Sequence, residues 1–382
     1  MRRIYVDHNA TTPLAPEVVA AMTQVLRDHF GNPSSLHWYG QRARALVEEA
    51  RASVARLVGA SAAEIVFTGS GTEADNMALR GACAAAAGRR RLLFAAIEHH
   101  AVIHCARGLA EDGWTAEPIR VATSGCVDLD HLAQLVDEHT AVVAVMLANN
   151  ETGVIQPVAA VAQLAHAHGA LVLCDAVQAA GKIPVDVKAL DADLVALSAH
   201  KLCGPKGVGA LWVRRGARLK PFLRGGAQER NRRAGTENVA GIVGFGQAAR
   251  LALDRLPQEM VHTRTLRDSL ERALLAIAGT DINGQEPRVP NTSNVSFDET
   301  EAESLVMALD LAGVAAASGA ACASGAVEPS HVLRAMGLPP RRVASALRLS
   351  LGHDNTEADV VEVAAAVAQA VEQQRRRRAP SR

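Results

Sequence analysis

The sequence predicts an α/β protein with a large domain, built on a mostly parallel sheet flanked by helices, and a smaller α+β domain. Three observations carry this prediction. From about residue 17 to residue 254, short apolar runs alternate with amphipathic stretches, which favours a parallel sheet covered by helices on both faces. After Pro257 this alternation stops. With 382 residues the chain also exceeds the usual size of one hydrophobic core, so we expect two domains.

The elements follow from these patterns in chain order. Apolar runs predict strands over residues 64–67, 91–94, 141–146, 170–174 and 193–197, and amphipathic stretches predict helices over 41–58 and 73–87. Beyond Pro257 we expect a helix over 259–278, a loop rich in Pro, Gly and Asn over 283–294, a strand over 294–297 and a helix over 301–312. We therefore place the large domain at residues 16–256. The small domain then combines residues 1–15 with 257–382.

Composition excludes several classes of function. The formal net charge is zero and 49% of the residues are hydrophobic, so we expect a folded protein that contacts neither nucleic acid nor an anionic membrane. No apolar run reaches membrane-spanning length, and the first residues lead directly into a short strand pattern. We expect a soluble, cytoplasmic protein. The run from Arg375 to Arg378 is interpreted as a solvated, frayed tail.

The cysteines and histidines show no metal-binding pattern. The six cysteines are far apart and form no CxxC pair, which indicates neither a disulfide framework nor a structural zinc site. His100 and His104 have helical i, i+4 spacing, but a metal site needs a third ligand. We expect no metal.

A lysine at a strand end is the strongest chemical signal. The chain has 40 Lys and Arg residues, of which five are lysines. Lys201 follows the apolar run 193–197, and Asp175 follows the run 170–174. An amine can form a Schiff base, whereas a guanidinium cannot. A lysine that holds an aldehyde and a carboxylate that keeps a pyridine nitrogen protonated together indicate pyridoxal 5'-phosphate.

A phosphate cradle is predicted between the first strand and helix of this domain. The turn 69–73 contains Gly71 and Thr72 and leads from a strand into a helix, so free backbone amides could bind a phosphate there. An ordinary helix cap made by Ser70 or Thr72 is an equally good interpretation of this turn alone.

Two further side chains are candidates. His99 follows a strand and could stack on a flat ring and move protons, or it could be structural. Cys322 lies among small residues at 318–325, which predicts a mobile, exposed thiol able to visit one site and deliver to another. The alternative for Cys322 is a small apolar side chain in a packed turn.

The chain resembles the cysteine desulfurases of the nitrogen-fixation type, in the class V aminotransferase group of fold-type-I pyridoxal-phosphate enzymes. The similarity covers nearly the whole chain. The motifs that carry it lie at residues 5–12, 31–35, 149–153, 174–178, 198–201, 233–238, 328–333 and 347–350.

The resemblance implies a role for each matching residue. It implies that Lys201 forms the Schiff base, that Asp175 pairs with the pyridinium nitrogen and that His99 stacks on the ring and moves protons. Arg348 would clamp the substrate carboxylate. The remaining implied contacts are with the phosphate (Gly71, Thr72, Ser198, His200), with the phenolic oxygen and substrate region (Gln178, Asn150), and with the phosphate of the neighbouring subunit (Thr236).

The implied reaction converts L-cysteine to L-alanine. The Cys322 thiolate, carried on a loop at about 318–330, would attack the substrate sulfur and keep it as a persulfide. The implied partners are a second copy of the chain in a homodimer and a sulfur-acceptor protein such as an iron-sulfur scaffold. Where the family carries hydroxyl side chains beside the nucleophile, this chain has Ala320 and Ala323.

The sequence is also compatible with other functions. An aminotransferase or β-lyase would use the same cofactor residues and leave Cys322 idle. A sulfur-carrier or scaffold protein with a degenerate pocket would bind no cofactor. Among sulfur-transfer functions, iron-sulfur assembly competes with supply of sulfur for tRNA, DNA or thio-cofactor modification.

Overall fold

The computed structural model describes residues 2–319, 322–323, 326–327 and 329–378. Its main sheet consists of β2 (Ile65–Thr68), β3 (Arg91–Ala95), β4 (Thr115–Ile119), β5 (Thr140–Ala144), β6 (Leu171–Asp175), β7 (Leu194–Ser198) and β8 (Gly209–Val213). The strand order is β2-β8-β7-β6-β5-β3-β4. In this sheet β8 runs antiparallel to both of its neighbours, β2 and β7, and the other pairings are parallel. The predicted mostly parallel sheet is confirmed.

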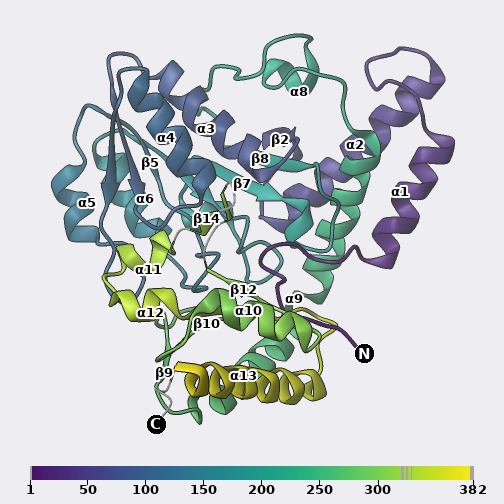
Figure 1. Ribbon diagram of the computed structural model, residues 1–382. Coiled ribbons are helices and arrows are strands. Elements are labelled where there is room, and N and C mark those ends of the chain that lie inside the picture. The colour runs from purple at the N-terminus through teal and green to yellow at the C-terminus, as the bar shows by residue number, and fades with distance from the viewer. Residues whose placement is uncertain (1, 320–321, 324–325, 328, 379–382) are drawn as a thin grey trace.

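Helices cover both faces of this sheet (Figure 1). They are α1 (Pro16–Asp28), α2 (Trp38–Leu57), α3 (Gly71–Ala85), α4 (His100–Glu111), α5 (Leu129–Leu135), α6 (Val158–Ala167), α7 (Val187–Leu190), α8 (Gln228–Asn231) and α9 (Val239–Leu275), with short 3-10 turns η1 (Ala62–Glu64) and η2 (Ala199–Lys201).

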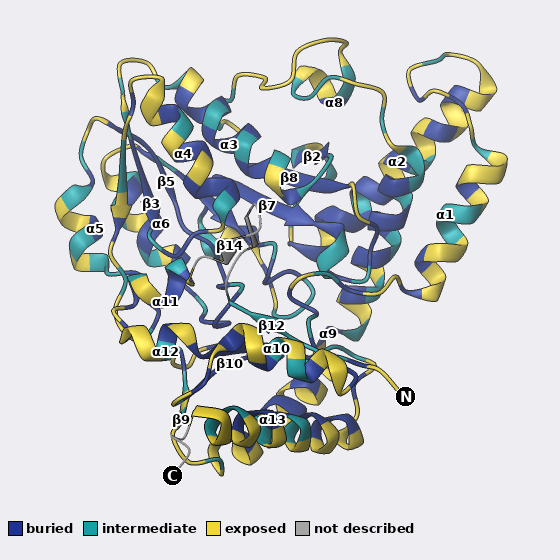
Figure 2. Ribbon diagram, viewed as in Figure 1, coloured by how far each residue is buried: buried dark blue, intermediate teal, exposed yellow. Residues whose placement is uncertain are grey.

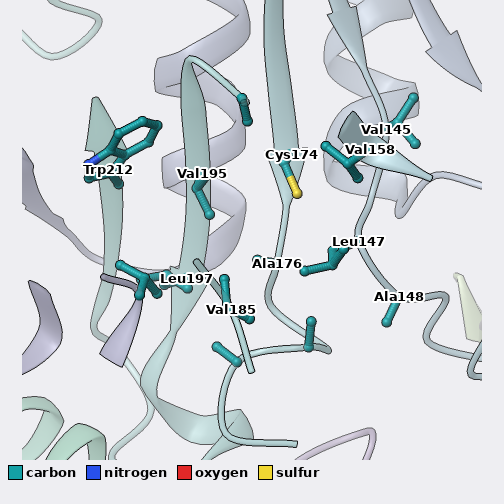
Figure 3. Packing of buried hydrophobic residues seen from close by; sticks show 14 of the residues in the cluster. Val145, Leu147, Ala148, Val158, Cys174, Ala176, Val185, Val195, Leu197 and Trp212 are labelled. Atoms are coloured by element: carbon teal, nitrogen blue, oxygen red, sulfur yellow. The ribbon is translucent and has the colours of Figure 1, made fainter. Parts of the chain in front are cut away.

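Side-chain alternation along the strands explains the two layers. In β7, Val195 and Leu197 pack in the cluster that includes α2, α6 and α9, whereas Leu194 and Ala196 pack with α3 and α4. Successive side chains of a strand point to opposite faces, so an uninterrupted apolar strand needs cover on both sides. Figure 3 shows the first cluster around Cys174, and Figure 2 shows the sheet as the most buried part of the fold.

A second, smaller sheet lies beside the first. Its strands β9 (Thr280–Ile282), β10 (Thr292–Phe297), β12 (Ala317–Ser318) and β15 (Ala346–Ser350) pair antiparallel in the order β12-β15-β10-β9. Its helices are α10 (Ala302–Leu311), α11 (His331–Ala335), α12 (Pro340–Ala344) and α13 (Glu357–Arg378). A separate hydrophobic cluster, which includes Phe297 and Leu347, fills the space between this sheet and helices α9, α10 and α13.

One short pairing joins a distant part of the chain to this region, and another joins two strands that are neighbours in sequence. The amino-terminal β1 (Ile4–Tyr5) runs parallel to β11 (Val314–Ala315). The backbones of β13 (Cys322–Ala323) and β14 (Ala326–Val327) pair antiparallel.

One helix differs from its prediction. The sequence predicts a helix that begins at residue 259, after Pro257, but α9 runs through Pro257 without ending. Proline costs an interior helix one hydrogen bond. Burial outweighs that cost here, because α9 contributes Phe245 to the first cluster and Leu270 to the small-sheet cluster. The expected division between residues 256 and 257 falls inside this helix, and the assignment of two domains stays a prediction.

The carboxyl-terminal arginine run is also more ordered than expected. Residues 375–378 form the end of α13, where Arg375 Nε donates to the Asp298 carbonyl at 3.0 Å and Arg376 pairs with Glu372 at 2.6 Å. The interpretation as a frayed tail was therefore wrong for the described part of the run. Of the helices in the described ranges, none combines the length and the apolar composition that a bilayer crossing requires.

Candidate active site

A cavity of about 290 Å³ lies at the carboxyl edge of the main sheet. Nine predicted site residues line it: Gly71, Thr72, His99, Asn150, Asp175, Gln178, Ser198, His200 and Lys201. Asp175 ends β6 and Ser198 ends β7, while the chain beyond β3 and β5 leads to His99 and Asn150. Ligands of open parallel sheets bind at this edge, and the topology therefore explains why these distant residues meet.

Lys201 lies in η2, directly after β7, with its amine held by the amino-terminal segment. Nζ donates to the Asn9 carbonyl at 2.5 Å and to the Ala10 carbonyl at 2.9 Å. Burial, followed by the positive charge of Arg348, lowers the pKa of Lys201 to about 8, against the opposing effect of Asp175. A neutral amine is the nucleophilic form, so this lysine is suited to bond an aldehyde near neutral pH.

Asp175 belongs to a group of buried carboxyls. Its Oδ1 accepts the Val177 N–H at 2.9 Å, and burial raises its pKa to about 6. Asp75, which also lines the cavity, is 1% exposed, and burial followed by repulsion from Asp175 and Glu98 raises its pKa well above the usual range. Among the described residues, Asp75 Oδ1 and Glu98 Oε2 have no hydrogen-bond partner. Of the two cavity carboxyls, Asp175 is therefore the one that ionises more readily.

The turn that the sequence offers as a phosphate cradle is closely packed against β6 and β7 in the fold. Ser70 caps α3 by accepting the Glu73 N–H at 3.1 Å, so the helix-cap interpretation is correct for this residue. A Cβ at Gly71 would lie 2.9 Å from Val177 Cγ2 and 3.3 Å from Ser198 Cβ. Ser198 Oγ is buried and has no hydrogen-bond partner among the described groups. The turn thus leaves helix amides and one hydroxyl available to an anion.

His99 is the N-cap of α4. Its Nδ1 accepts the Ala101 N–H at 3.1 Å, which places the proton of the neutral ring on Nε2. Desolvation, followed by the charge of Lys201, lowers its pKa below the usual value. In this arrangement His99 can stack on a ring and donate from Nε2, and it accepts a proton at Nε2 only after the tautomer changes.

A hydrogen-bond network behind Lys201 has no counterpart in the sequence patterns. The Asn9 carbonyl accepts from Lys201 Nζ and also from Gln178 Nε2 at 2.9 Å. Lys182 Nζ donates to Asn9 Oδ1 at 2.8 Å and to Gln178 Oε1 at 2.5 Å. The only available signal was that Lys182 is one of five lysines. His200 joins the same segment, with Nδ1 3.2 Å from Thr11 Oγ1.

Arg348 and Thr236 do not line the cavity. The Arg348 guanidinium on β15 pairs with Asp7 at 2.7 Å and donates to the Asn150 carbonyl at 3.3 Å. Thr236 is exposed beside a separate hollow at Glu229 and Arg233. The side chain of Cys322, predicted to be the nucleophile, lies outside the described residues, as does Ala320, and only the backbone of β13 is described there.

Comparison with known proteins decides the family. Residues 4–363 match the model of the aminotransferase class-V family. The chain belongs to the class-V aminotransferase family. It is 45% identical over 377 residues to a cysteine desulfurase of Nostoc sp., which covers 98% of this chain and 94% of that relative.

Solved structures agree with this assignment. A NifS-like protein superposes with a TM-score of 0.91 at 36% identity, over 97% of this chain and all of the other. A structure titled SspA in complex with cysteine gives a TM-score of 0.81 at 29% identity, over 91% of this chain and 98% of that one. The predicted family and the fold of type-I pyridoxal-phosphate enzymes are therefore confirmed.

This family depends on pyridoxal 5'-phosphate, and the class-V aminotransferase site fits that cofactor. The Ser198 Oγ, unpartnered among the described groups, and the turn at Gly71, where a Cβ would crowd Val177, suit the phosphate. Lys201 Nζ suits the aldehyde, and the buried Asp175 suits the ring nitrogen. Asn150 Oδ1, which has no partner among the described groups, offers one more acceptor in this cavity.

Proposed function

We propose that the protein is a cysteine desulfurase that uses pyridoxal 5'-phosphate to convert L-cysteine to L-alanine and leaves a persulfide on Cys322. The observation that carries this proposal is one cavity that contains an amine of lowered pKa, a buried carboxyl and an unpartnered hydroxyl beside a helix start. Relatives named cysteine desulfurase that align over nearly the whole chain support the choice of substrate.

The proposed roles of the cavity residues follow from their contacts. When bound, the cofactor supplies a ring that accepts electrons from the α-carbon of the amino acid. Lys201 Nζ would hold the cofactor and then move the α-proton, since its lowered pKa leaves part of the amine neutral. Asp175 would keep the ring nitrogen protonated. His99 would stack on the ring with its Nε2 proton available.

The remaining roles concern the two charged ends of the bound molecules. Gly71, Thr72, Ser198 and His200 would bind the phosphate, and Thr236 would reach it from the partner in a homodimer. Gln178 and Asn150 would contact the phenolic oxygen and the substrate region. Arg348 would bind the substrate carboxylate through its planar fork, in competition with Asp7.

The sulfur step balances without an added oxidant. The Cys322 thiolate attacks the substrate sulfur, an S–S bond forms, and the Cβ–S bond breaks with its electron pair left on carbon. Protonation of that carbon yields alanine, and the neutral sulfur atom stays on Cys322 as a persulfide. We propose further that a cytoplasmic acceptor, such as an iron-sulfur scaffold protein, then takes this sulfur.

A substitution at the nucleophile tests the activity. The loaded wild-type enzyme should release alanine and sulfide in equal amounts from L-cysteine with a thiol reductant, and Cys322→Ala should release neither. Cys126→Ala, at a half-buried free thiol, is the matched control and should keep full activity. A β-lyase would keep its activity in Cys322→Ala, and a protein that gains no visible absorption with the cofactor would be no enzyme of this class.

The dimer and the acceptor need their own tests. Size-exclusion chromatography with light scattering should give a dimer mass. A mixture of Thr236→Ala and Lys201→Ala chains should regain part of the activity if Thr236 serves the neighbouring site. Wild-type enzyme loaded with labelled persulfide should transfer the label to one acceptor in an extract of the native cell.

A further inference from the structure

Three contacts hold the described ends of the segment that carries Cys322, and each involves a predicted site residue or its neighbour in sequence. On the entering side, Ala317 and Ser318 of β12 pair with Arg348 and Leu347 of β15. On the leaving side, His331 Nε2 lies 2.9 Å from the Glu98 carbonyl, next to His99. The third contact, at Glu151, joins the two sides.

Glu151 lies between the two ends. Ser330 Oγ donates to Glu151 Oε2 at 2.5 Å, and both residues are buried, Ser330 at 4% and Glu151 at 3% exposure. On the other side, a Cβ built on Gly319 would lie 2.4 Å from the same Oε2 and 3.7 Å from Ser330 Cβ. One carboxylate oxygen therefore fills the space in which a side chain at position 319 would lie, and it accepts the hydroxyl of the capping serine at position 330.

The backbone around Glu151 places this carboxyl firmly. Asn149 Oδ1 accepts the N–H groups of Glu151 and Thr152, each at 2.9 Å, and Asn294 Nδ2 donates to the Glu151 carbonyl at 3.3 Å. The turn closes at Gly153, whose φ of +78° favours glycine. The same turn presents Asn150 to the cofactor cavity, so Asn150 and Glu151 keep a fixed spacing.

Within the described part of the chain, the buried Glu151 carboxyl accepts a hydrogen bond from Ser330. Burial raises the pKa of Glu151 to about 7, while the Ser330 hydroxyl and the charge of Arg348 oppose that rise. A glutamine of the same shape would avoid the cost of burying a charge. The retained carboxylate is a stronger acceptor for the Ser330 hydroxyl than a neutral amide.

We propose that Glu151 is a positioning residue that fixes Gly319 and Ser330, and with them the two ends of the Cys322 segment, beside the turn that carries Asn150. The proposal rests on the proposed desulfurase activity for its kinetic readout. Glu151 acts through Ser330 and Gly319 and touches neither cofactor nor substrate in this role. Its loss should slow sulfur transfer to Cys322 after the substrate has bound.

The test compares single-turnover persulfide formation in the holoenzyme of four variants. Glu151→Gln should lower the saturating rate of persulfide formation by about tenfold, with cofactor content and KM for L-cysteine unchanged. Gly319→Ala should have a similar effect, because the added methyl group displaces Oε2. Ser330→Ala and the double variant Glu151→Gln/Ser330→Ala should be equally slow, since Glu151 acts through the serine hydroxyl.

The control separates this role from general loss of stability. Ser330 also caps α11, so its loss could act only through the stability of a helix. Asp128→Ala removes the cap of another short helix, α5, and should lower Tm without changing the persulfide rate. A wild-type rate in Glu151→Gln, or additive losses in the double variant, would overturn the proposal. An absence of persulfide in wild-type enzyme would instead overturn the desulfurase function and leave the Glu151 contact unexplained.

Discussion

Arg348 Nη2 lies 2.7 Å from Asp7 Oδ1, so the guanidinium proposed to bind the substrate carboxylate already has an anionic partner in the protein. A second donor of the same fork reaches the Asn150 carbonyl. The substrate must therefore share or replace these contacts. This pairing also fixes Arg348 near Lys201, whose pKa it lowers.

Arg348→Lys should raise the KM for L-cysteine by on the order of tenfold, because a single ammonium cannot donate to Asp7 and to a carboxylate in the same planar geometry. Cofactor affinity should not change, since Arg348 does not line the cofactor cavity. Steady-state kinetics measure the KM, and a fluorescence titration with cofactor measures the cofactor affinity. Arg341→Lys, at an exposed arginine of α12, is the control, and an unchanged KM in Arg348→Lys would exclude the carboxylate role.

The same isosteric change should have very different effects on kcat at Asp75 and at Asp175. Asp75→Asn should keep kcat within about threefold of wild type, because burial already favours the neutral form of that carboxyl. Asp175→Asn should lower kcat by about 100-fold or more, because an amide cannot balance a protonated ring nitrogen. Activity and the absorption spectrum of both loaded variants provide the measurement. Equal losses in the two variants would contradict the assignment of the ionised carboxylate to Asp175.

Capture of the cofactor by the unloaded protein should become faster with rising pH. The pKa of Lys201 is lowered to about 8, so the neutral amine gains about tenfold per pH unit below that value and levels off above it. Stopped-flow absorbance from about pH 6.5 to about pH 9.5 checks this. Repeating the series with pyridoxal, which lacks the phosphate, removes the ionisation of that group as a cause. A profile that keeps rising towards the usual lysine pKa would show that the amine is not perturbed.

The free energy of unfolding should depend on pH through Glu151, with a defined sign. Burial raises the pKa of Glu151 from 4.5 to about 7, so the folded state binds this proton more tightly than the unfolded state does. The resulting stability is complete below pH 4.5 and is lost as pH rises through 7.

Glu151→Gln does not titrate and should escape this loss. Between about pH 5 and about pH 8, the free energy of unfolding of the variant should gain on wild type by up to about 3 kcal/mol. Urea unfolding at both pH values measures the difference. A difference that does not change with pH would mean that Glu151 ionises normally in the folded protein.

The buried pair between Arg51 and Glu229 should matter for both stability and assembly. Arg51 donates to both carboxylate oxygens of Glu229 at 2.6 and 2.7 Å, and that carboxylate also accepts the Phe67 N–H. Arg51→Met should lower the free energy of unfolding by about 3–5 kcal/mol, because it leaves a buried charge unpaired. Arg255→Met, at an exposed ion pair with Glu17, is the control and should cost little. If the dimer of Arg51→Met also dissociates more readily, the Arg51–Glu229 pair would be shown to support the nearby segment that carries Thr236.

Local patterns were sufficient for much of the fold. The strand ends at Asp175 and Ser198 could be predicted because continuous apolar runs stop there, and the topology of a parallel sheet then brings their side chains to one edge. The length of α9 could not be predicted, because its continuation through Pro257 depends on packing against two separate clusters.

The unpredicted part of the site depends on contacts between distant segments. The carbonyl of Asn9 receives Lys201 and Gln178, and no local pattern reveals a backbone acceptor. Asp75 looks like an ordinary polar residue of a helix until its surroundings are known. Glu151 lies in the motif at residues 149–153, but only the fold shows that Ser330 and Gly319 meet at its carboxyl group.

The continuity of α9 has a consequence for how such a chain can change in evolution. A recombination breakpoint anywhere between Val239 and Leu275 would join two parts of α9 from different parents. One part would pack in each of the two hydrophobic clusters. The apolar side chains of each part would then have to point, in the correct helical phase, at a packing surface from the other parent. Exchange of the part that holds the cofactor between relatives should therefore succeed only when this helix is inherited whole.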